Sequence, residues 1–331
     1  MKKGNISIFV PHLGCPQNCS FCNQRTISGH SKAPDASDVH AAVQAAMQSP
    51  DFGSHSLQIA FFGGSFTAID KSYQQLLLQA AAPYIKSGTV TGVRISTRPD
   101  CIEREHVLWL KQMGVTDIEL GAQCLDDRVL ALNDRGHTVQ DVYRAVGIIK
   151  ECGVNVGLQM MCGLYGSDDE TDIFTAKQFI DMRPDCVRIY PTLTLKGTKL
   201  FELYQKGEYI PANLDDTVQL CAILLEMFQR ENIPVIRLGL HDDVALKEGY
   251  AAGPMHPAFG ELVQSRIYYH LLQDIMKDRP AGKLVLRVNK SDVSKLTGHG
   301  GVNRRALKEK GFDLQVIPDE NLPHYYIECE D

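Results

Sequence analysis

The sequence contains no hydrophobic run long enough to span a membrane. A membrane-spanning helix needs about 20 mostly apolar residues, whereas the run that begins at Ile6 reaches only Val10 before Pro11 interrupts it. The same run is shorter than the apolar core of a signal peptide. We therefore expect a cytoplasmic protein that has no membrane partner.

An excess of positive charge is also missing. The 331 residues include 34 Lys and Arg against 40 Asp and Glu, which gives a formal net charge of −6. This balance provides no broad cationic surface for nucleic acid, so contact with nucleic acid would need a local basic patch. Low-complexity tracts and repeats of fixed period are absent as well. The chain is typical of a globular protein with a full hydrophobic core.

The ten cysteines include a single close group, Cys15, Cys19 and Cys22, spaced C-x3-C-x2-C after the first apolar run. Three thiolates on one short loop can face a common iron or zinc centre. A zinc site usually adds a second cysteine pair, which the sequence lacks, although His12 is near enough to be a fourth ligand. In a reducing compartment we expect the other seven cysteines to be buried as small apolar residues. They are Cys101, Cys124, Cys152, Cys162, Cys186, Cys221 and Cys329.

Apolar runs alternate with helical patterns over the first 190 or so residues. Strands are predicted at 6–10, 57–62, 90–96, 115–120, 154–161 and 186–190, and helices at 38–47, 73–84, 102–113, before 132, 139–152 and 170–182. This alternation predicts βαβ units and a parallel sheet. Strands that are apolar throughout are expected where helices cover both faces. Polar or glycine residues follow each strand, which favours an α/β barrel over a doubly wound sheet.

Beyond residue 210 the regular alternation stops. Helices are predicted at 217–231, 262–276, 294–296 and 303–310, strands at 234–240, 284–288, 312–317 and 324–328, and a loop rich in Gly, Pro and His at 248–261. We therefore predict a barrel domain over residues 1–210 and a C-terminal extension over 211–331. Within the extension, residues 280–331 are predicted to form a small α/β module.

The cysteine loop resembles the signature of the radical S-adenosylmethionine (SAM) enzymes, which have C-x3-C-x2-C after the first barrel strand. The resemblance implies that Cys15, Cys19 and Cys22 bind a [4Fe–4S] cluster, with SAM at the fourth iron. It also implies the reaction, in which the reduced cluster cleaves SAM and a 5′-deoxyadenosyl radical takes a hydrogen atom from the substrate. Phe21 fits the aromatic residue that the family usually has before the third cysteine.

The resemblance also assigns the end of the second strand to SAM. Gly63 and Gly64 stand where the family often has two glycines, and their missing side chains would let the SAM amino group approach the backbone. The family often continues with a glutamate, whereas this chain has Ser65. Recognition of the amino group is therefore expected to rest on backbone carbonyls.

Polar residues at or just after the third to fifth strands are expected to hold the rest of SAM. Arg135 suits the carboxylate, because a guanidinium can form a two-pronged hydrogen bond with it. Gln123 is expected to orient the methionyl end, and Ser96 and Gln159 to reach the ribose hydroxyls. Two further residues, Met161 and Tyr190, are expected to flank the adenine or the sulfonium.

Five motifs resemble the radical SAM domain of the Elongator catalytic subunit. They are PHLGCP from residue 11, STRPD from 96, IELGAQ from 118, NDRGHT from 133 and IYPTL from 189. The likeness implies an open partial TIM barrel, (β/α)6. The residues after the barrel are too few for the Elongator acetyltransferase domain, so the chain resembles a stand-alone bacterial group with its own C-terminal extension. A more distant similarity, through Arg135-Gly136-His137 and Leu164, leads to oxygen-independent coproporphyrinogen III oxidase.

The substrate stays open between two classes, and a non-enzymatic iron–sulfur or zinc binding protein is the third alternative. RNA, in particular tRNA, is favoured by the Elongator likeness, by the glycine turn at residues 298–301 and by a basic C-terminal run. That run comprises Lys290, Lys295, His299, Arg304, Arg305, Lys308 and Lys310. A small metabolite would instead enter through the loop at 253–261, where His256 can exchange a proton. A radical SAM enzyme also needs an electron donor such as flavodoxin or ferredoxin.

Overall fold

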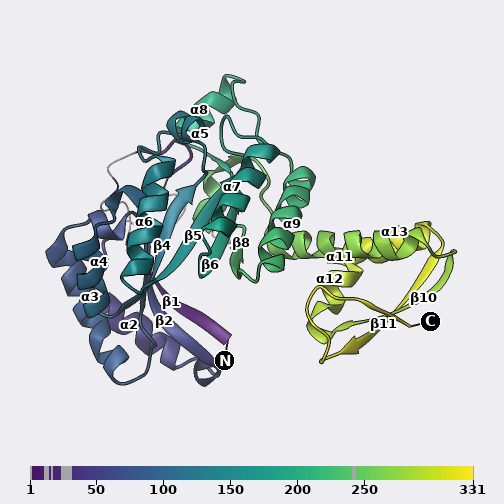
Figure 1. Ribbon diagram of the computed structural model, residues 1–331, viewed down its shortest axis with the longest axis horizontal. Helices are drawn as coiled ribbons and strands as arrows, with labels where there is room; N and C mark the ends of the chain where they lie inside the picture. The colour runs from purple at the N-terminus through teal and green to yellow at the C-terminus, as the bar shows by residue number, and fades with distance from the viewer. Residues whose placement is uncertain (1, 11–14, 16–17, 24–31, 241–243, 331) are drawn as a thin grey trace. The chain divides into compact units, whose positions relative to one another are not determined.

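The computed structural model describes residues 2–10, 15, 18–23, 32–240 and 244–330 (Figure 1). The chain forms two compact units, Met1–Ala212 with Phe228–Pro254, and Asn213–Met227 with Met255–Asp331. The division predicted near residue 210 stays a prediction. Among the described residues, no helix combines the length and the apolar character that a membrane span requires.

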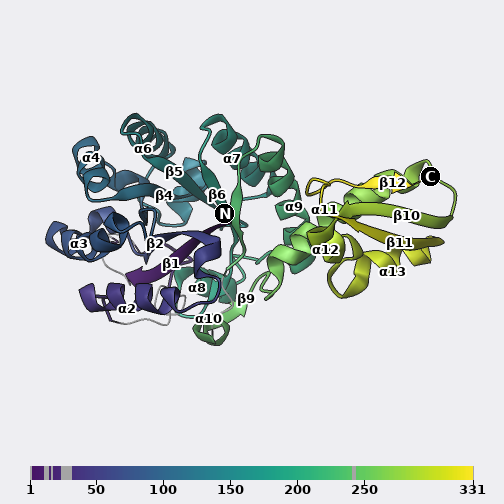
Figure 2. The same cartoon turned by 90° about the horizontal axis from the view of Figure 1, so that it is seen from below.

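The first unit is built on one seven-stranded parallel sheet. In spatial order its strands are β1 (Lys2–Val10), β2 (His55–Gly63), β3 (Val93–Thr97), β4 (Val115–Gln123), β5 (Asn155–Cys162), β6 (Cys186–Pro191) and β8 (Val235–Leu238). Figure 2 shows the sheet curving, with α2, α3, α4, α6 and α7 along its outer side. The predicted open partial barrel of the α/β class is confirmed, and β8 extends it by a seventh strand beyond the six expected.

Helices alternate with these strands, as the hydrophobic pattern predicted. They are α2 (Ala36–Met47), α3 (Lys71–Lys86), α4 (Arg104–Gln112), α5 (Asp127–Leu132), α6 (Val139–Glu151), α7 (Asp169–Asp181) and α8 (Lys199–Gln205). Side-chain oxygens cap the first turns of all of them except α4, which satisfies amide groups that lack a partner inside the helix. The capping residues are Asp35, Asp70, Asp126, Thr138, Asp168 and Thr198. These caps mark where the preceding loops end.

Charged and polar residues alternate with apolar ones along β3, β4 and β6, so the prediction of apolar strands is wrong for these three strands. They are Arg94 and Ser96 in β3, Asp117 and Glu119 in β4, and Arg188 and Tyr190 in β6. Side chains two residues apart lie on one face of a strand. The strands still looked apolar because the charges are few and the intervening residues are Val, Ile and Leu.

The second unit contains a three-stranded sheet and helices that pack on it. Its elements are the larger part of α9 (Leu214–Arg230), α11 (Phe259–Lys277), β10 (Gly282–Asn289), α12 (Val293–Thr297), α13 (Val302–Glu309), β11 (Phe312–Asp319) and β12 (Glu328–Glu330). β10 lies in the middle, parallel to β11 and antiparallel to β12. Tyr268, Leu286, Leu296 and Leu307 form its core with neighbouring apolar residues.

Two local predictions need correction. The loop expected at 248–261 contains β9 (Tyr250–Ala252), which pairs antiparallel with β7 (Thr194–Leu195), and α11 begins within it at Phe259. The short helix α10 (Val244–Gly249) precedes β9. Of the seven cysteines expected to be buried, Cys101 and Cys329 are half-buried and the other five are buried.

Candidate functional site

The cysteine loop follows β1 at the carboxyl edge of the sheet and is tied to two later parts of the barrel. Cys15, Cys19 and Cys22 are all half-buried, and none of them forms a disulfide. Between them, the buried Ser20 donates to Asn133 twice, from its amide to the carbonyl at 3.0 Å and from Oγ to Oδ1 at 2.7 Å. The Ser20 carbonyl accepts from the amide of Leu200 at the start of α8. These bonds hold the middle of the loop against segments more than 100 residues away.

Arg135 lies against this loop. Its Nη1 donates to Sγ of Cys19 at 3.0 Å, and its Nη2 donates to the carbonyl of Gly121 at the end of β4. The guanidinium carbon is 5.9 Å from the centre of the Phe21 ring. One guanidinium thus contacts both the cysteine loop and the end of β4. The sequence prediction had assigned Arg135 to the SAM carboxylate and did not foresee its contact with a cysteine.

Phe21 anchors an apolar cluster behind the cysteines. It packs with buried Leu130, Leu164 and Leu200, and Met161 lies at the edge of the same cluster. Cys19 and Cys22 also contact the cluster. The burial of Phe21 therefore fixes the positions of Cys19 and Cys22, which lie on either side of it in the sequence.

Gly63 and Gly64 line a small hollow together with Val10, Ser96 and neighbouring residues of β2. At Gly63 the backbone has φ +107°, and a Cβ atom would lie 2.4 Å from the Val10 carbonyl oxygen. Glycine is therefore required where β2 meets the end of β1. Ser65 is buried with its Oγ 2.8 Å from Thr97 Oγ1, so its hydroxyl supports the turn.

Several buried polar atoms near the cysteine loop have no partner among the described residues. They include Oε1 of Gln123, Nε of Arg135 and Nη1 of Arg98. Gln123 adopts the left-handed backbone conformation, with φ +68°. Buried polar groups are almost always hydrogen-bonded in native proteins. A ligand with a carboxylate and an amino group would satisfy these atoms, so the site fits SAM.

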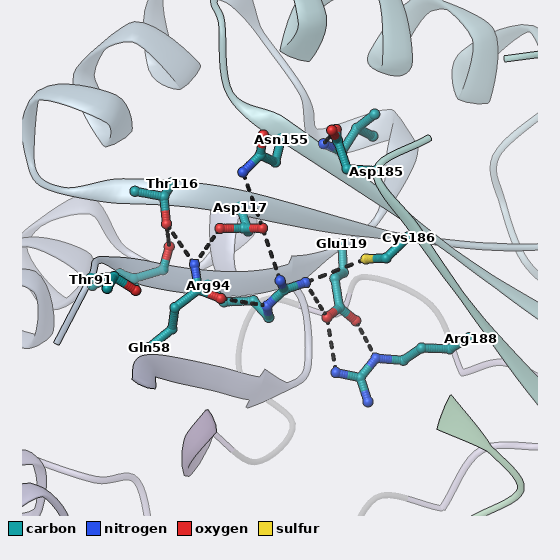
Figure 3. A network of polar contacts seen from close by, with 12 residues as sticks. Gln58, Thr91, Arg94, Thr116, Asp117, Glu119, Asn155, Asp185, Cys186 and Arg188 are labelled. Atoms are coloured by element: carbon teal, nitrogen blue, oxygen red, sulfur yellow. Dashed lines mark hydrogen bonds and ion pairs between the residues drawn. The ribbon is translucent and has the colours of Figure 1, made fainter. Parts of the chain in front are cut away.

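A network of buried charged side chains connects β3, β4 and β6 (Figure 3). The Glu119 carboxylate is 1% exposed and accepts four hydrogen bonds, from Arg94 Nη1 at 2.8 Å, from Arg188 Nε and Nη2 at 2.6 and 2.9 Å, and from Gln159 Nε2 at 2.8 Å. Arg94 also donates to Asp117 at 2.8 Å. The negative charges of two buried acids, Asp117 and Glu119, thus offset the positive charges of two buried arginines.

The pKa of Glu119 reflects this balance. Burial alone would raise it, but the charges and hydrogen bonds of Arg188 and Arg94 hold the pKa below its usual value. Near the cysteine loop, burial and the nearby guanidinium of Arg135 lower the pKa of His137 to about 4. His137 is therefore neutral at physiological pH, and Glu119 is ionised.

Three predicted SAM contacts adjoin the network. Gln159 donates to Glu119 and, at 3.4 Å, to Ser96 Oγ. Tyr190 forms a side-chain hydrogen bond with Arg188, and burial is the main reason that its pKa is raised. Tyr190 pairs with Met161 across β5 and β6. The sheet thus brings Ser96 and Gln159 together, and it brings Met161 and Tyr190 together.

The structure places the predicted substrate-side residues in the second unit. His256 lies edge-on to His299, with ring centres 5.4 Å apart. Arg304 donates to the Leu314 carbonyl and Arg305 to the Gly300 carbonyl. His12, the proposed zinc ligand, falls outside the described residues. Among those that are described, no three His, Cys, Asp or Glu side chains are grouped as ligands of a single metal ion.

The sequence interpretation missed the buried ion-pair cluster of Arg94, Glu119 and Arg188. A signal was present, since Arg94 precedes Ser96 by two residues and Arg188 precedes Tyr190 by two. Residues two apart on a strand share a face. The predicted SAM contacts Ser96 and Tyr190 therefore each have an arginine two residues earlier on the same face of their strand.

The curved parallel sheet defines a partial-barrel α/β protein, and the cysteine loop lies at the end of its first strand. This chain belongs to the radical SAM superfamily. The superfamily model matches residues 9–177, and the model of the Radical SAM C-terminal domain matches residues 184–269. The chain is therefore a radical SAM enzyme, of a family that uses SAM and an iron–sulfur cluster.

Known relatives place its radical SAM region with the Elongator-type proteins. The tRNA uridine(34) acetyltransferase of Methanocaldococcus jannaschii is 28% identical over 186 residues, which are 50% of this chain and 34% of that protein. Human Elongator complex protein 3 is 28% identical over 191 residues, 52% of this chain and 35% of that protein. The chain thus spans about a third of the length of these two relatives.

The solved structure of archaeal Elp3 from Methanocaldococcus infernus has the same fold. It superposes with a TM-score of 0.62 at 22% identity, covering 84% of this chain and 65% of that one. At this identity the similarity supports a shared fold and nothing further.

Proposed function

We propose that this enzyme holds a [4Fe–4S] cluster through Cys15, Cys19 and Cys22, cleaves SAM reductively and acts on RNA, with tRNA as the favoured class. The observation that carries the proposal is the Arg135 guanidinium, which donates to Sγ of Cys19 while its Nε remains buried and unpartnered. One side chain thus joins the cysteine loop to the end of β4. The radical SAM signature implies that three thiolates hold the cluster and leave one iron open.

When bound, the cluster and SAM supply a 5′-deoxyadenosyl radical that removes a hydrogen atom from the substrate. The task of the chain is to hold both groups and to exclude water. Unpartnered donors of Arg135 and Arg98 suit the SAM carboxylate, and Oε1 of Gln123 suits its amino group. Gly63 and Gly64 leave room for that group at the backbone.

The ribose and adenine are assigned to the inner edge of the sheet. Ser96 and Gln159 offer polar atoms for the ribose hydroxyls, and Gln159 is held in place by Glu119. Met161 and Tyr190 present an apolar face for the adenine. A one-electron donor such as flavodoxin or ferredoxin completes the proposed reaction.

RNA is favoured as the substrate because of the relatives named above. The curated names of two relatives refer to tRNA uridine 34 or to Elongator, and their radical SAM regions are homologous to this one. The second unit supplies basic residues, although Lys290 and Lys295 are paired with Glu320 and Asp292. Any RNA contact there must use the remaining cations.

The cluster can be tested by anaerobic reconstitution with iron and sulfide. We expect about four irons per chain and absorbance near 400 nm, as for [4Fe–4S] proteins. The Cys19→Ala variant should lose most of the iron, whereas Cys101→Ala, which removes another half-buried thiol, should keep it. One zinc per chain without such absorbance would refute the proposal.

The substrate can be tested by comparing cells with and without the protein under anaerobic conditions. Nucleosides from purified tRNA and small metabolites are both analysed by mass spectrometry. Loss of a modified nucleoside in the deletion strain, restored by the intact protein and not by Cys19→Ala, supports RNA. Unchanged nucleosides together with an altered metabolite would favour a small-molecule substrate.

A further inference from the structure

The second unit carries a glycine loop between two short helices. α12 ends at Thr297, the loop Gly298-His299-Gly300-Gly301 follows, and α13 begins at Val302. Gly298, Gly300 and Gly301 have φ of +83°, +60° and +78°. Three left-handed residues so close together require glycine, because side chains disfavour this conformation. We call this segment the glycine loop.

The two ends of the glycine loop differ in packing. A Cβ atom on Gly298 would lie 2.7 Å from the Asn303 amide nitrogen, so this glycine is needed for close packing. A Cβ atom on Gly300 would meet nothing within 4 Å. Asn303 is buried and donates to the carbonyls of Ser265 and Leu296, which secures the base of the loop. The loop is therefore held firmly at its base, and its backbone is open at Gly300.

A cation without a carboxylate partner lies on this open backbone. Nη1 of Arg305 donates to the Gly300 carbonyl at 2.6 Å. No ion pair joins Arg305 to an acid in the part of the chain that the structure describes. By contrast, Lys290 and Lys295 of the same unit are paired with Glu320 and Asp292. The remaining N–H groups of Arg305 suit a phosphate, which a guanidinium binds through parallel hydrogen bonds.

Two histidine rings are in contact at the glycine loop. His299 belongs to it, and the His256 ring meets the His299 ring edge to face at 5.4 Å. Nδ1 of His299 lies 3.3 Å from Glu261 Oε2. His256 and Arg305, which the sequence had suggested separately for the substrate, therefore adjoin one loop.

A pocket of about 550 Å³ adjoins the start of α13. Val302 and Ala306 line it from α13, and Leu262 and Tyr269 line it from α11. Nζ of Lys310 is 5.7 Å from the centre of the Tyr269 ring. Aromatic rings next to cationic groups are the surfaces on which single-stranded nucleic acids stack their bases.

We propose that this surface binds single-stranded RNA, with the sugar–phosphate backbone on the glycine loop and Arg305, and a base in the pocket beside Tyr269. A G-x-x-G loop is how the KH class of RNA-binding modules holds about four backbone nucleotides. The inference rests on the proposed function in taking RNA as the substrate class. It adds the part of the chain that binds the RNA and the form of RNA that is bound.

The test measures RNA binding by the full-length protein without SAM. A fluorescent single-stranded RNA of about ten nucleotides, within usual site sizes, is titrated at several salt concentrations, and the same RNA is titrated as a duplex. The double variant His299→Asp, Gly300→Asp places two negative charges on the glycine loop. Asp is tolerated in the left-handed region, and Gly300 has open space. Gly88→Asp is the matched control, because Gly88 has φ +74° and equally open surroundings in the first unit.

We expect the double variant to bind single strands at least about tenfold more weakly and Gly88→Asp to stay within about twofold of the parent. Arg305→Gln, which leaves the loop backbone unchanged, should bind about fivefold more weakly and lower the salt slope by about 0.7. Three results would overturn the inference. The first is that the double variant and Arg305→Gln both bind like Gly88→Asp. The others are a duplex that binds as tightly as the single strand, and no detectable binding at low salt. Thermal unfolding of each variant shows whether a loss reflects misfolding, in which case Arg305→Gln decides.

Failure of this inference can be told apart from failure of the proposed function. Formation of 5′-deoxyadenosine by the reconstituted parent protein is measured separately and needs no RNA binding. SAM cleavage without RNA binding would overturn only the role of the glycine loop. RNA binding without iron or SAM cleavage would overturn the proposed chemistry and leave the loop assignment standing.

Discussion

Nη1 of Arg135 donates a hydrogen bond to Sγ of Cys19 at 3.0 Å, although the two residues are 116 positions apart in the sequence. The same guanidinium donates to the carbonyl of Gly121 at the end of β4. One side chain thus connects the cysteine loop after β1 to the middle of the sheet. This contact makes the geometry of the cysteine loop depend on the position of β4.

Replacement of Arg135 by Gln should therefore affect both stability and iron binding. The Gly121 carbonyl would lose a buried donor, which costs about 1–3 kcal/mol of unfolding free energy. We also expect less iron to be retained after reconstitution. Urea unfolding and iron analysis measure the two effects. Arg144→Gln, which removes an exposed guanidinium, is the control and should change neither; equal behaviour of the two variants would contradict the prediction.

Glu119→Gln should be strongly destabilising. The carboxylate is 1% exposed and faces both Arg94 and Arg188, and removing one partner of a buried ion pair costs about 3–5 kcal/mol. Glu151→Gln breaks the exposed pair with Arg104, and such pairs contribute about 0–1 kcal/mol. Urea unfolding at neutral pH compares the variants. A loss below about 1 kcal/mol for Glu119→Gln would show that the network is not held as described.

His137 should make the protein less stable in mild acid. Burial and Arg135 lower its folded pKa to about 4, whereas an unfolded histidine titrates near 6.5. Between these pH values the unfolded state binds more protons, so this residue reduces stability by about 1.4 kcal/mol per pH unit as the pH falls.

The variant His137→Gln can keep a donor toward the Ala122 carbonyl, which the histidine contacts at 3.3 Å, but it does not titrate. The stability of the parent relative to this variant should therefore decrease from pH 6.5 toward pH 4. Urea unfolding at a series of pH values measures the difference. A difference that stays constant over this range would rule out a buried neutral His137.

Gly63→Ala should destabilise the junction of β1 and β2. The backbone φ is +107°, and the new Cβ would lie 2.4 Å from the Val10 carbonyl oxygen, so we expect a cost of about 1–3 kcal/mol. Gly147→Ala is the matched control, because Gly147 lies inside α6 with open space at its Cβ position. That change should stabilise the helix by about 0.5–1 kcal/mol. Thermal unfolding that gave both variants the same sign would contradict this account.

The sequence predicted the fold class because the strands and helices alternate with clear hydrophobic patterns. It also indicated the cysteine loop and the glycines of β2, since both are short local motifs. It did not predict that β8 joins the sheet, because this strand follows the long helix α9 outside the regular alternation. Strand pairing over such distances leaves no local signal.

The charged network shows a second limit of prediction from the sequence. Glu119 stands inside a motif that was singled out, yet its partners Arg94 and Arg188 come from strands 25 and 69 residues away. Only the register of β3, β4, β5 and β6 brings these side chains together. In the same way, the contact between His256 and His299 depends on packing within the second unit and not on spacing in the sequence.

The most direct test of the central claim is SAM cleavage by the anaerobically reconstituted protein after reduction. We predict that 5′-deoxyadenosine and methionine form in equal amounts, and that the variant with Cys15, Cys19 and Cys22 all replaced by Ala forms neither. Cys101→Ala should cleave SAM like the parent. Product formation that persists in the triple variant, or a fully reconstituted and reduced parent that leaves SAM intact, would contradict the account.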